Sequence, residues 1–151
     1  MDLILWRHAE AEDGIPDEAR RLTAKGERQA KRMAKWLAAR LPGDAVLVSS
    51  KALRARQTAR ALRADFETSP ALGVGSDARA LLAAAGWPSS ARRTAVLVGH
   101  QPTLGEAAAL ALTGSDAPLN LKKGALVWLA QRRRAGKAEI VLRAAMSPDL
   151  L

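Results

Sequence analysis

The chain contains no cysteine and no tyrosine, and only two of its 151 residues are histidine. The lack of cysteine excludes disulfides, thiolate nucleophiles and cysteine-ligated zinc, and it is compatible with a reducing compartment. One phenylalanine and four tryptophans leave little material for stacking bases, so we expect no nucleic-acid partner. No apolar run approaches the ~20 residues of a membrane span. The first apolar run, residues 3–6, is too short for a signal peptide, so we expect a cytoplasmic protein with no membrane partner.

A length of 151 residues predicts a single domain, residues 1–151, with one substantial core. The formal charge of +9 comes mostly from arginine. A solvated basic surface is its ordinary meaning, and attraction of acidic or phosphorylated partners is the alternative. Nothing in the sequence requires an oligomer, so a monomer is the default.

Short apolar runs alternate with segments of helical spacing. Three runs without polar alternation, at 3–6, 45–48 and 95–98, are typical of strands buried on both faces. Helices are expected over 24–41, 51–63 and 103–112, with a further helix ending near residue 86. The expected caps are Thr23 for the first helix, Ser49 or Ser50 for the second, Ser76 or Asp77 for the third, and a Thr103/Glu106 capping box for the fourth.

Residues 66–68 form a candidate short strand, and two further strands are expected over 125–130 and 138–143, joined as an antiparallel hairpin with the basic cluster 132–134 in its turn. The alternation of strands and helices predicts an α/β protein. Its architecture would be a three-layer α/β/α sandwich, with a mostly parallel central sheet and an antiparallel edge strand.

Cationic and titratable side chains follow the three buried runs. Arg7 and His8 follow the first run, Arg54 lies just after the second, and His100 follows the third. In open α/β sheets, ligands bind outside the carboxyl ends of the strands. If the three strands are neighbours, two arginines and both histidines meet at one edge of the sheet.

Such a cluster suits phosphoryl transfer. Arginine offers planar donors that match phosphate oxygens, and neutral imidazole is an accepted covalent catalyst. Fixed cations stabilise the charge of the transferring group, so the site requires no metal and no cofactor. The competing interpretations are structural histidines, surface arginines, or a zinc site, for which the sequence offers neither cysteine nor a His-x-x-x-His pair.

At these residues the sequence resembles the histidine phosphatase superfamily, the phosphoglycerate-mutase-like group, and within it the small SixA-type phosphohistidine phosphatases. Arg7-His8-Ala9 is similar to the Arg-His-Gly hallmark. Three further blocks, at 22–26, 49–58 and 99–104, are similar to family segments in the same order, and so is Met-Ser-Pro at 146–148.

The resemblance implies that His8 is the nucleophile that becomes phosphorylated. Arg7, Arg54 and His100 would bind the phosphoryl oxygens and stabilise the transition state. Arg20 would add a phosphate contact, and the amide of Gln101 would point into the same pocket and donate as well. Water would then hydrolyse the phosphohistidine.

Two substitutions depart from the family pattern, Ala9 for glycine and Ser50 for proline, and neither removes a reacting group. The general acid is not matched by a motif. The candidates are Glu67 and Asp77, of which Asp77 is preferred. An N-cap role explains Asp77 equally well.

The function expected from the resemblance is a metal-independent phosphatase acting on phosphohistidine in a protein, for which a histidine-phosphotransfer domain is one candidate. The segment between the second and third strands is short, which favours an open pocket that a protein side chain enters. The alternatives are a phosphatase for a small phosphate ester and a phosphate-binding module without activity.

Overall fold

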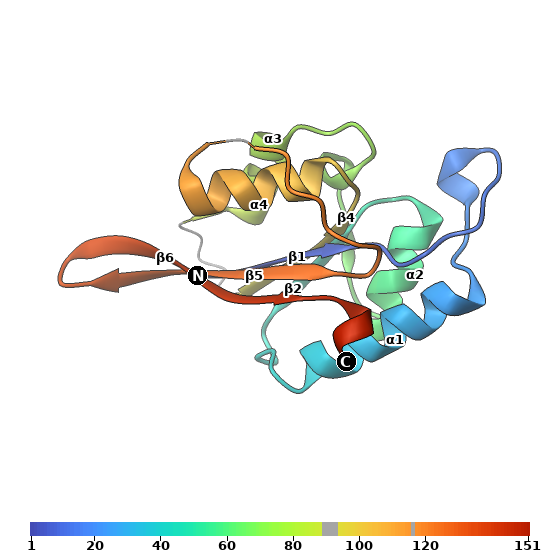
Figure 1. The fold of residues 1–151 in the computed structure, drawn as a ribbon, viewed down its shortest axis with the longest axis horizontal. Coiled ribbons are helices and arrows are strands. Elements are labelled where there is room, and N and C mark those ends of the chain that lie inside the picture. The colour runs from blue at the N-terminus through green and yellow to red at the C-terminus, as the bar shows by residue number, and fades with distance from the viewer. Residues whose placement is uncertain (89–93, 116) are drawn as a thin grey trace.

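The computed structural model describes residues 1–88, 94–115 and 117–151. Among these residues, six strands form one mixed sheet in the order β3-β2-β4-β1-β5-β6 (Figure 1). The strands are β1 (Asp2–Arg7), β2 (Val46–Ser49), β3 (Glu67–Thr68), β4 (Thr94–Gly99), β5 (Leu126–Arg134) and β6 (Lys137–Met146). The neighbours β3-β2-β4-β1 pair in parallel, whereas β5 and β6 are antiparallel. The predicted α/β class, with a mostly parallel sheet and an antiparallel edge, is confirmed.

Helices cover both faces of this sheet (Figure 1). One face packs against α1 (Ala24–Ala38) and α2 (Leu53–Leu62), and the other packs against α3 (Ala78–Ala85) and α4 (Thr103–Thr113). Three short 3-10 turns complete the described elements: η1 (Asp17–Ala19), η2 (Pro70–Leu72) and η3 (Pro148–Leu150). The result is the expected three-layer α/β/α sandwich.

The core explains why β1 lacks polar alternation. Leu3 and Leu5 pack with the α3/α4 layer, whereas Ile4 and Trp6 pack with the α1/α2 layer. All four side chains are fully buried because each face of the strand lies against a helical layer. The buried strand fixes the position of the residues that follow it.

The β5-β6 hairpin extends beyond the helical layers, at the left of Figure 1. Its ladder continues to the pair Arg134–Lys137, so the turn is only Ala135-Gly136, both with positive φ. The prediction that Arg132–Arg134 forms the turn was therefore wrong, because these residues still pair along β5.

Two of the predicted helix caps are confirmed and two are wrong. Thr23 caps α1, since its Oγ1 accepts from the Gly26 amide, and Asp77 caps α3. Ala52, not a serine, is the N-cap residue of α2, and Pro102 is the N-cap residue of α4. The first helix also ends at Ala38, before the predicted position 41. In the described residues, no helix combines the length and the apolar character that crossing a membrane demands.

Candidate active site

The backbone around His8 is held from three directions at the carboxyl end of β1. The His8 amide donates to the carbonyl of Gly99 at 3.1 Å, and the amide of Gly124 donates to the His8 carbonyl at 3.0 Å. The next amide, that of Ala9, donates to Thr58 Oγ1 of α2 at 3.1 Å. The end of β4, the segment before β5 and α2 therefore fix the backbone from which the imidazole projects.

The imidazole of His8 is oriented by its own chain. Its Nδ1 lies 2.7 Å from the carbonyl oxygen of Ala9. Since a carbonyl only accepts, Nδ1 carries the proton and the neutral ring keeps its lone pair on Nε2. Nε2 thus carries the free lone pair of the ring, and it faces Arg54.

The guanidinium of Arg54 lies between the two histidines. Its Nε is 3.4 Å from His8 Nε2, and its Nη2 is 3.4 Å from His100 Nδ1. Thr58 holds the start of α2 in place, because its hydroxyl donates to the Arg54 carbonyl at 2.8 Å. The same threonine side chain therefore links Arg54 to the backbone beside His8.

His100 is oriented by Ser50. The His100 Nε2 lies 2.9 Å from Ser50 Oγ, and its Nδ1 faces the donating guanidinium of Arg54. This pairing places the proton on Nε2 and the lone pair on Nδ1. The two imidazole rings lie 5.0 Å apart between centroids, tilted by 56°.

Both imidazoles are neutral near pH 7. His8 and His100 are only 9% and 4% exposed. Burial, assisted by the charge of Arg54, lowers the pKa of His8 to about 3 and that of His100 to about 4. A neutral imidazole keeps the lone pair that nucleophilic attack requires, and no separate base is needed to uncover it.

Arg7 carries an unused donor. Its Nη1 donates to the carbonyl of Leu121 at 2.5 Å. Within the described part of the chain, its buried Nε has no hydrogen-bond partner. Burial lowers the pKa of Arg7, and its positive charge helps to lower the pKa of His8 and His100. A buried guanidinium N–H without a partner is costly, and a bound anion would satisfy it.

Asp17 supplies an anion next to the histidines. Its Oδ2 accepts from Arg54 Nη2 at 2.9 Å, and its main-chain carbonyl accepts from Arg54 Nη1 at 2.7 Å. Bonds to Arg20 and then to Arg54 lower the pKa of Asp17. The Arg54 side chain is nearly buried, whereas that of Asp17 is about half exposed. A surface carboxylate thus occupies the donors that the sequence assigns to phosphate.

Arg20, the predicted additional phosphate ligand, reaches the same carboxylate. Its Nη1 donates to Asp17 Oδ1 at 3.0 Å, while Oδ2 is held by Arg54. The Arg20 Nε also donates to the Glu12 carbonyl at 2.6 Å. Arg20 and Arg54 therefore bind the same carboxylate, and Asp17 connects Arg20 to the group formed by Arg7, His8, Arg54 and His100. An anion replacing Asp17 would meet both arginines.

Gln101 has other partners in the structure. Its Nε2 donates to the Leu119 carbonyl at 2.8 Å, and its Oε1 accepts from the Gly105 amide at 2.8 Å. Both ends of the side-chain amide thus hold the loop before Leu121 against α4. Its Nε2 also faces Asn120 Oδ1 at 3.4 Å, and its predicted phosphate contact stays a prediction.

The predicted acid Asp77 is the N-cap residue of α3. Its Oδ1 accepts from the amides of Arg79 and Ala80, at 2.9 and 3.0 Å. Glu67, the other candidate, lies in the two-residue edge strand β3. The structure thus gives Asp77 a structural task, and proton donation by either carboxylate stays a prediction. No group of three or more metal-binding side chains occurs among residues 1–88, 94–115 and 117–151.

The block 22–26 fixes the segment after His8. The amide of Thr23 donates to the Glu10 carbonyl at 3.0 Å, and its hydroxyl donates to the Glu10 carboxylate. A Cβ on Gly26 would lie 1.9 Å from the Glu10 carbonyl oxygen, so only glycine allows α1 to approach this closely.

Three contributors to the site were not predicted from the sequence. Asp17 lies in a polar loop without periodicity, and its only signal is its i,i+3 spacing from Arg20. Ser50 was assigned to a helix cap, and its Oγ accepts from the Ala52 amide at 3.3 Å and also orients His100. Thr58 belongs to a matched block, but no pattern shows that its hydroxyl receives the Ala9 amide.

Comparison with known proteins agrees with this geometry. Residues 3–73 match the family model of the histidine phosphatase superfamily (branch 1). An uncharacterised protein of Picosynechococcus sp. is 37% identical over 150 residues, covering 93% of this chain and 88% of that protein.

Two solved structures extend the likeness to nearly the whole chain. The SixA-type protein from Nakamurella multipartitia is 26% identical with a TM-score of 0.78, covering 97% of this chain and 95% of the other. The protein histidine phosphatase SixA in complex with tungstate is 23% identical with a TM-score of 0.84, covering 99% of both chains, and shows a shared fold.

Proposed function

The chain belongs to the histidine phosphatase superfamily, and we propose that it is a metal-independent phosphatase that removes phosphoryl groups from phosphohistidine in a protein. The observation that carries this proposal is the orientation of His8. Its Nδ1 proton is held by the Ala9 carbonyl, and its Nε2 lone pair faces the Arg54 guanidinium.

In the first step, the phosphoryl group displaces the Asp17 carboxylate from Arg54. The lone pair of His8 Nε2 attacks phosphorus, the bond between phosphorus and the donor imidazole nitrogen breaks, and that nitrogen takes its electron pair and a proton from solvent. Arg54 and the free Nε–H of Arg7 bind the equatorial oxygens.

In the second step, water attacks the phosphorus of phosphorylated His8. The bond from phosphorus to Nε2 breaks, inorganic phosphate leaves, and the neutral tautomer of His8 is restored by its Nδ1 bond to Ala9. His100 approaches the same guanidinium, and a bound dianion favours protonation of its Nδ1, which then donates to the phosphoryl group.

The test is direct labelling of the protein. The full chain is mixed with a phosphohistidine-bearing carrier protein in EDTA, quenched in alkali and mapped by mass spectrometry. We expect acid-labile phosphate on His8, release of inorganic phosphate, and loss of both in His8→Ala. Arg56→Ala, an exposed change on α2, is the matched control. Transfer that requires added metal, or that persists in His8→Ala, contradicts the proposal.

Comparison of donors separates the alternatives. A protein phosphatase of this kind turns over phosphohistidine carrier at a higher kcat/KM than a panel of sugar phosphates and phosphoserine. Equal or greater turnover of small esters would favour the ester phosphatase. Phosphate binding without turnover of any donor would favour the binding module.

A further inference from the structure

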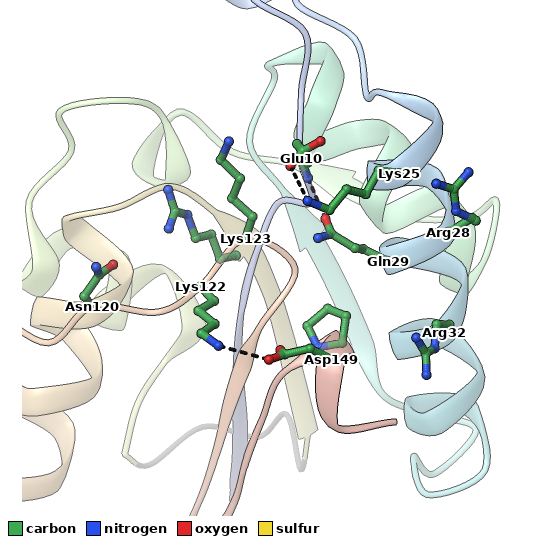
Figure 2. Close-up of a pocket in the computed structure, with 11 residues that line it drawn as sticks. Glu10, Lys25, Arg28, Gln29, Arg32, Asn120, Lys122, Lys123 and Asp149 are labelled. Carbon is green, nitrogen blue, oxygen red and sulfur yellow. Dashed lines mark hydrogen bonds and ion pairs between the residues drawn. The ribbon is translucent and has the colours of Figure 1, made fainter.

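A second basic region lies beside Arg7. It is a cleft of about 560 Å³ between α1 and the segment 120–123, with Pro148 and Asp149 of η3 as its third side (Figure 2). Figure 2 shows Arg28 and Arg32 along α1, on the opposite side of the cleft from Lys122 and Lys123. The reaction described above uses only Arg7 of this cleft.

Positive charge in the cleft exceeds negative charge by four. The two carboxylates are already paired, Glu10 with Lys25 at 3.2 Å and Asp149 with Lys122 at 3.0 Å. The cationic residues that line the cleft are Arg7, Lys25, Arg28, Arg32, Lys122 and Lys123. The cleft therefore attracts anions and is open to solvent, where such attraction depends on salt.

The cations on α1 form a line. Lys25, Arg28 and Arg32 follow one another at helical spacings of three and four residues, so they lie on one side of the helix. The line extends over about 10 Å at the rise of an α-helix. An elongated anion can contact all three residues, whereas a compact phosphate would contact one of them.

Arg7 connects this cleft to the reaction centre. Its guanidinium lines the cleft, and its charge acts on the pKa of both His8 and His100. Its Nη1 bond to the Leu121 carbonyl also ties it to the wall formed by 120–123. A ligand lying in the cleft thus meets Arg7, the residue that directly precedes His8.

We infer that this cleft is the docking surface for an acidic polypeptide segment of the phosphorylated protein. The inference rests on the proposed function, because it assigns the part of the same substrate that lies outside the reaction centre. A protein segment fits better than a nucleic acid, since none of the described lining residues is aromatic and bases would find no stacking partner.

The probes are two synthetic peptides with one phosphohistidine each. One carries glutamates at spacings of three and four residues beside the phosphohistidine, and the other carries glutamines at the same places. Phosphoramidate, which is too small to span the cleft, is the third donor. Each donor is used to label His8 at 20 mM and 300 mM salt.

The variants remove charge from one side of α1 or the other. Arg28→Gln/Arg32→Gln alters the cleft, and Lys31→Gln/Lys35→Gln removes the same charge at the same spacing from exposed positions that do not line it. Binding of the unphosphorylated acidic peptide to each protein is measured by fluorescence anisotropy.

We expect the acidic peptide to label wild type about tenfold faster than the neutral peptide at low salt, and this preference to shrink at high salt. The cleft variant loses the preference, the control keeps it, and labelling by phosphoramidate is the same in all three proteins. In the anisotropy measurements, the acidic peptide binds wild type and the control variant more tightly than it binds the cleft variant.

Three outcomes overturn the inference: equal labelling by both peptides, equal losses in the two variants, or tighter binding of a twelve-nucleotide single strand than of the acidic peptide at 150 mM salt. A failure of the proposed function is distinguishable, because phosphoramidate then leaves His8 unlabelled as well. In that case the anisotropy series still decides whether the cleft binds the acidic segment.

Discussion

At the reaction centre, the guanidinium of Arg54 is buried, and hydrogen bonds tie it to two imidazoles and a carboxylate. Along the basic cleft, Arg28 and Arg32 are exposed on α1 and extend into solvent. Both regions concentrate positive charge, but only the first holds it in a fixed geometry. A fixed cation stabilises a transition state, whereas a solvated cation mainly attracts a partner, so changes in the two regions should have different kinetic signatures.

The largest difference is expected from Arg54→Lys. Lysine keeps the charge but loses the planar group that reaches both His8 and His100. We expect kcat for phosphoramidate to fall by about 10²-fold, as for loss of one preorganised donor. Steady-state kinetics measure it, with circular dichroism to check folding and Arg56→Lys on the same helix as control. A fall of less than fivefold would mean that the fixed geometry of Arg54 does not matter.

Gly26 lies where α1, which carries the basic cleft, meets the segment after His8, so a substitution there should disturb both regions. A Cβ in Gly26→Ala would overlap the Glu10 carbonyl, so α1 must move away from the segment after His8. We expect the free energy of unfolding to fall by about 2 kcal/mol, as for overpacking. Urea denaturation measures it, with Lys31→Ala on an exposed site of α1 as the control. Equal stability of the two variants would show that the close approach is not required.

The regions should also differ in their response to pH. The pKa values of His8 and His100, about 3 and 4, lie below the ordinary 6.5, so between these values the unfolded chain binds more protons than the folded chain. The free energy of unfolding should therefore fall as pH drops from 7.5 to 5, by about 2 kcal/mol per histidine at pH 5.

The double variant His8→Gln/His100→Gln should lose this part of the pH dependence, whereas Arg28→Gln/Arg32→Gln should keep it, because the described cleft residues include no histidine. Urea unfolding at several pH values compares the three proteins. An unchanged slope in the histidine double variant would contradict the assignment of neutral imidazoles in the folded protein.

The smallest effect is expected from Asp17→Asn. The change weakens an anion that competes for Arg54, so inorganic phosphate should bind two- to fivefold more tightly, consistent with ~0.5–1 kcal/mol for a partly exposed ion pair. Inhibition by phosphate measures it. Asp13→Asn is the control, because Asp13 is paired with Arg20, at 3.6 Å, and not with Arg54. Weaker phosphate binding in Asp17→Asn would show that the carboxylate supports the anion site.

The fold could be predicted because β1, β2 and β4 are apolar runs bounded by turn residues. Helix ends were less predictable, since tertiary contacts decided them. Ser50 Oγ pairs with His100 Nε2, and the Thr103 hydroxyl donates to the carbonyl of Ser76 instead of forming a capping box. A local pattern contains no information about such partners.

The candidate site likewise has one part that could be predicted from the sequence and one part that could not. Motifs pointed to His8, Arg54 and His100, which the structure brings together, because each lies at or shortly after the end of a recognisable strand. The basic cleft could not be predicted, since Arg28 and Lys123 are far apart in the sequence and each resembles a solvated surface residue. Only the folding of segment 120–123 against α1 shows that they face one cleft.

The contact between Asp17 and Arg54 links anion binding at the reaction centre to the structure of the η1 turn on the surface. In the proposed reaction Arg54 is never left without a counterion, because the phosphoryl group that binds it replaces the Asp17 carboxylate. That exchange releases Asp17, and with it the bonds through which Arg54 holds the η1 turn. Anion binding at Arg54 and loosening of the η1 turn should therefore occur together. Faster amide hydrogen exchange in residues 17–20 would then report that the site is occupied.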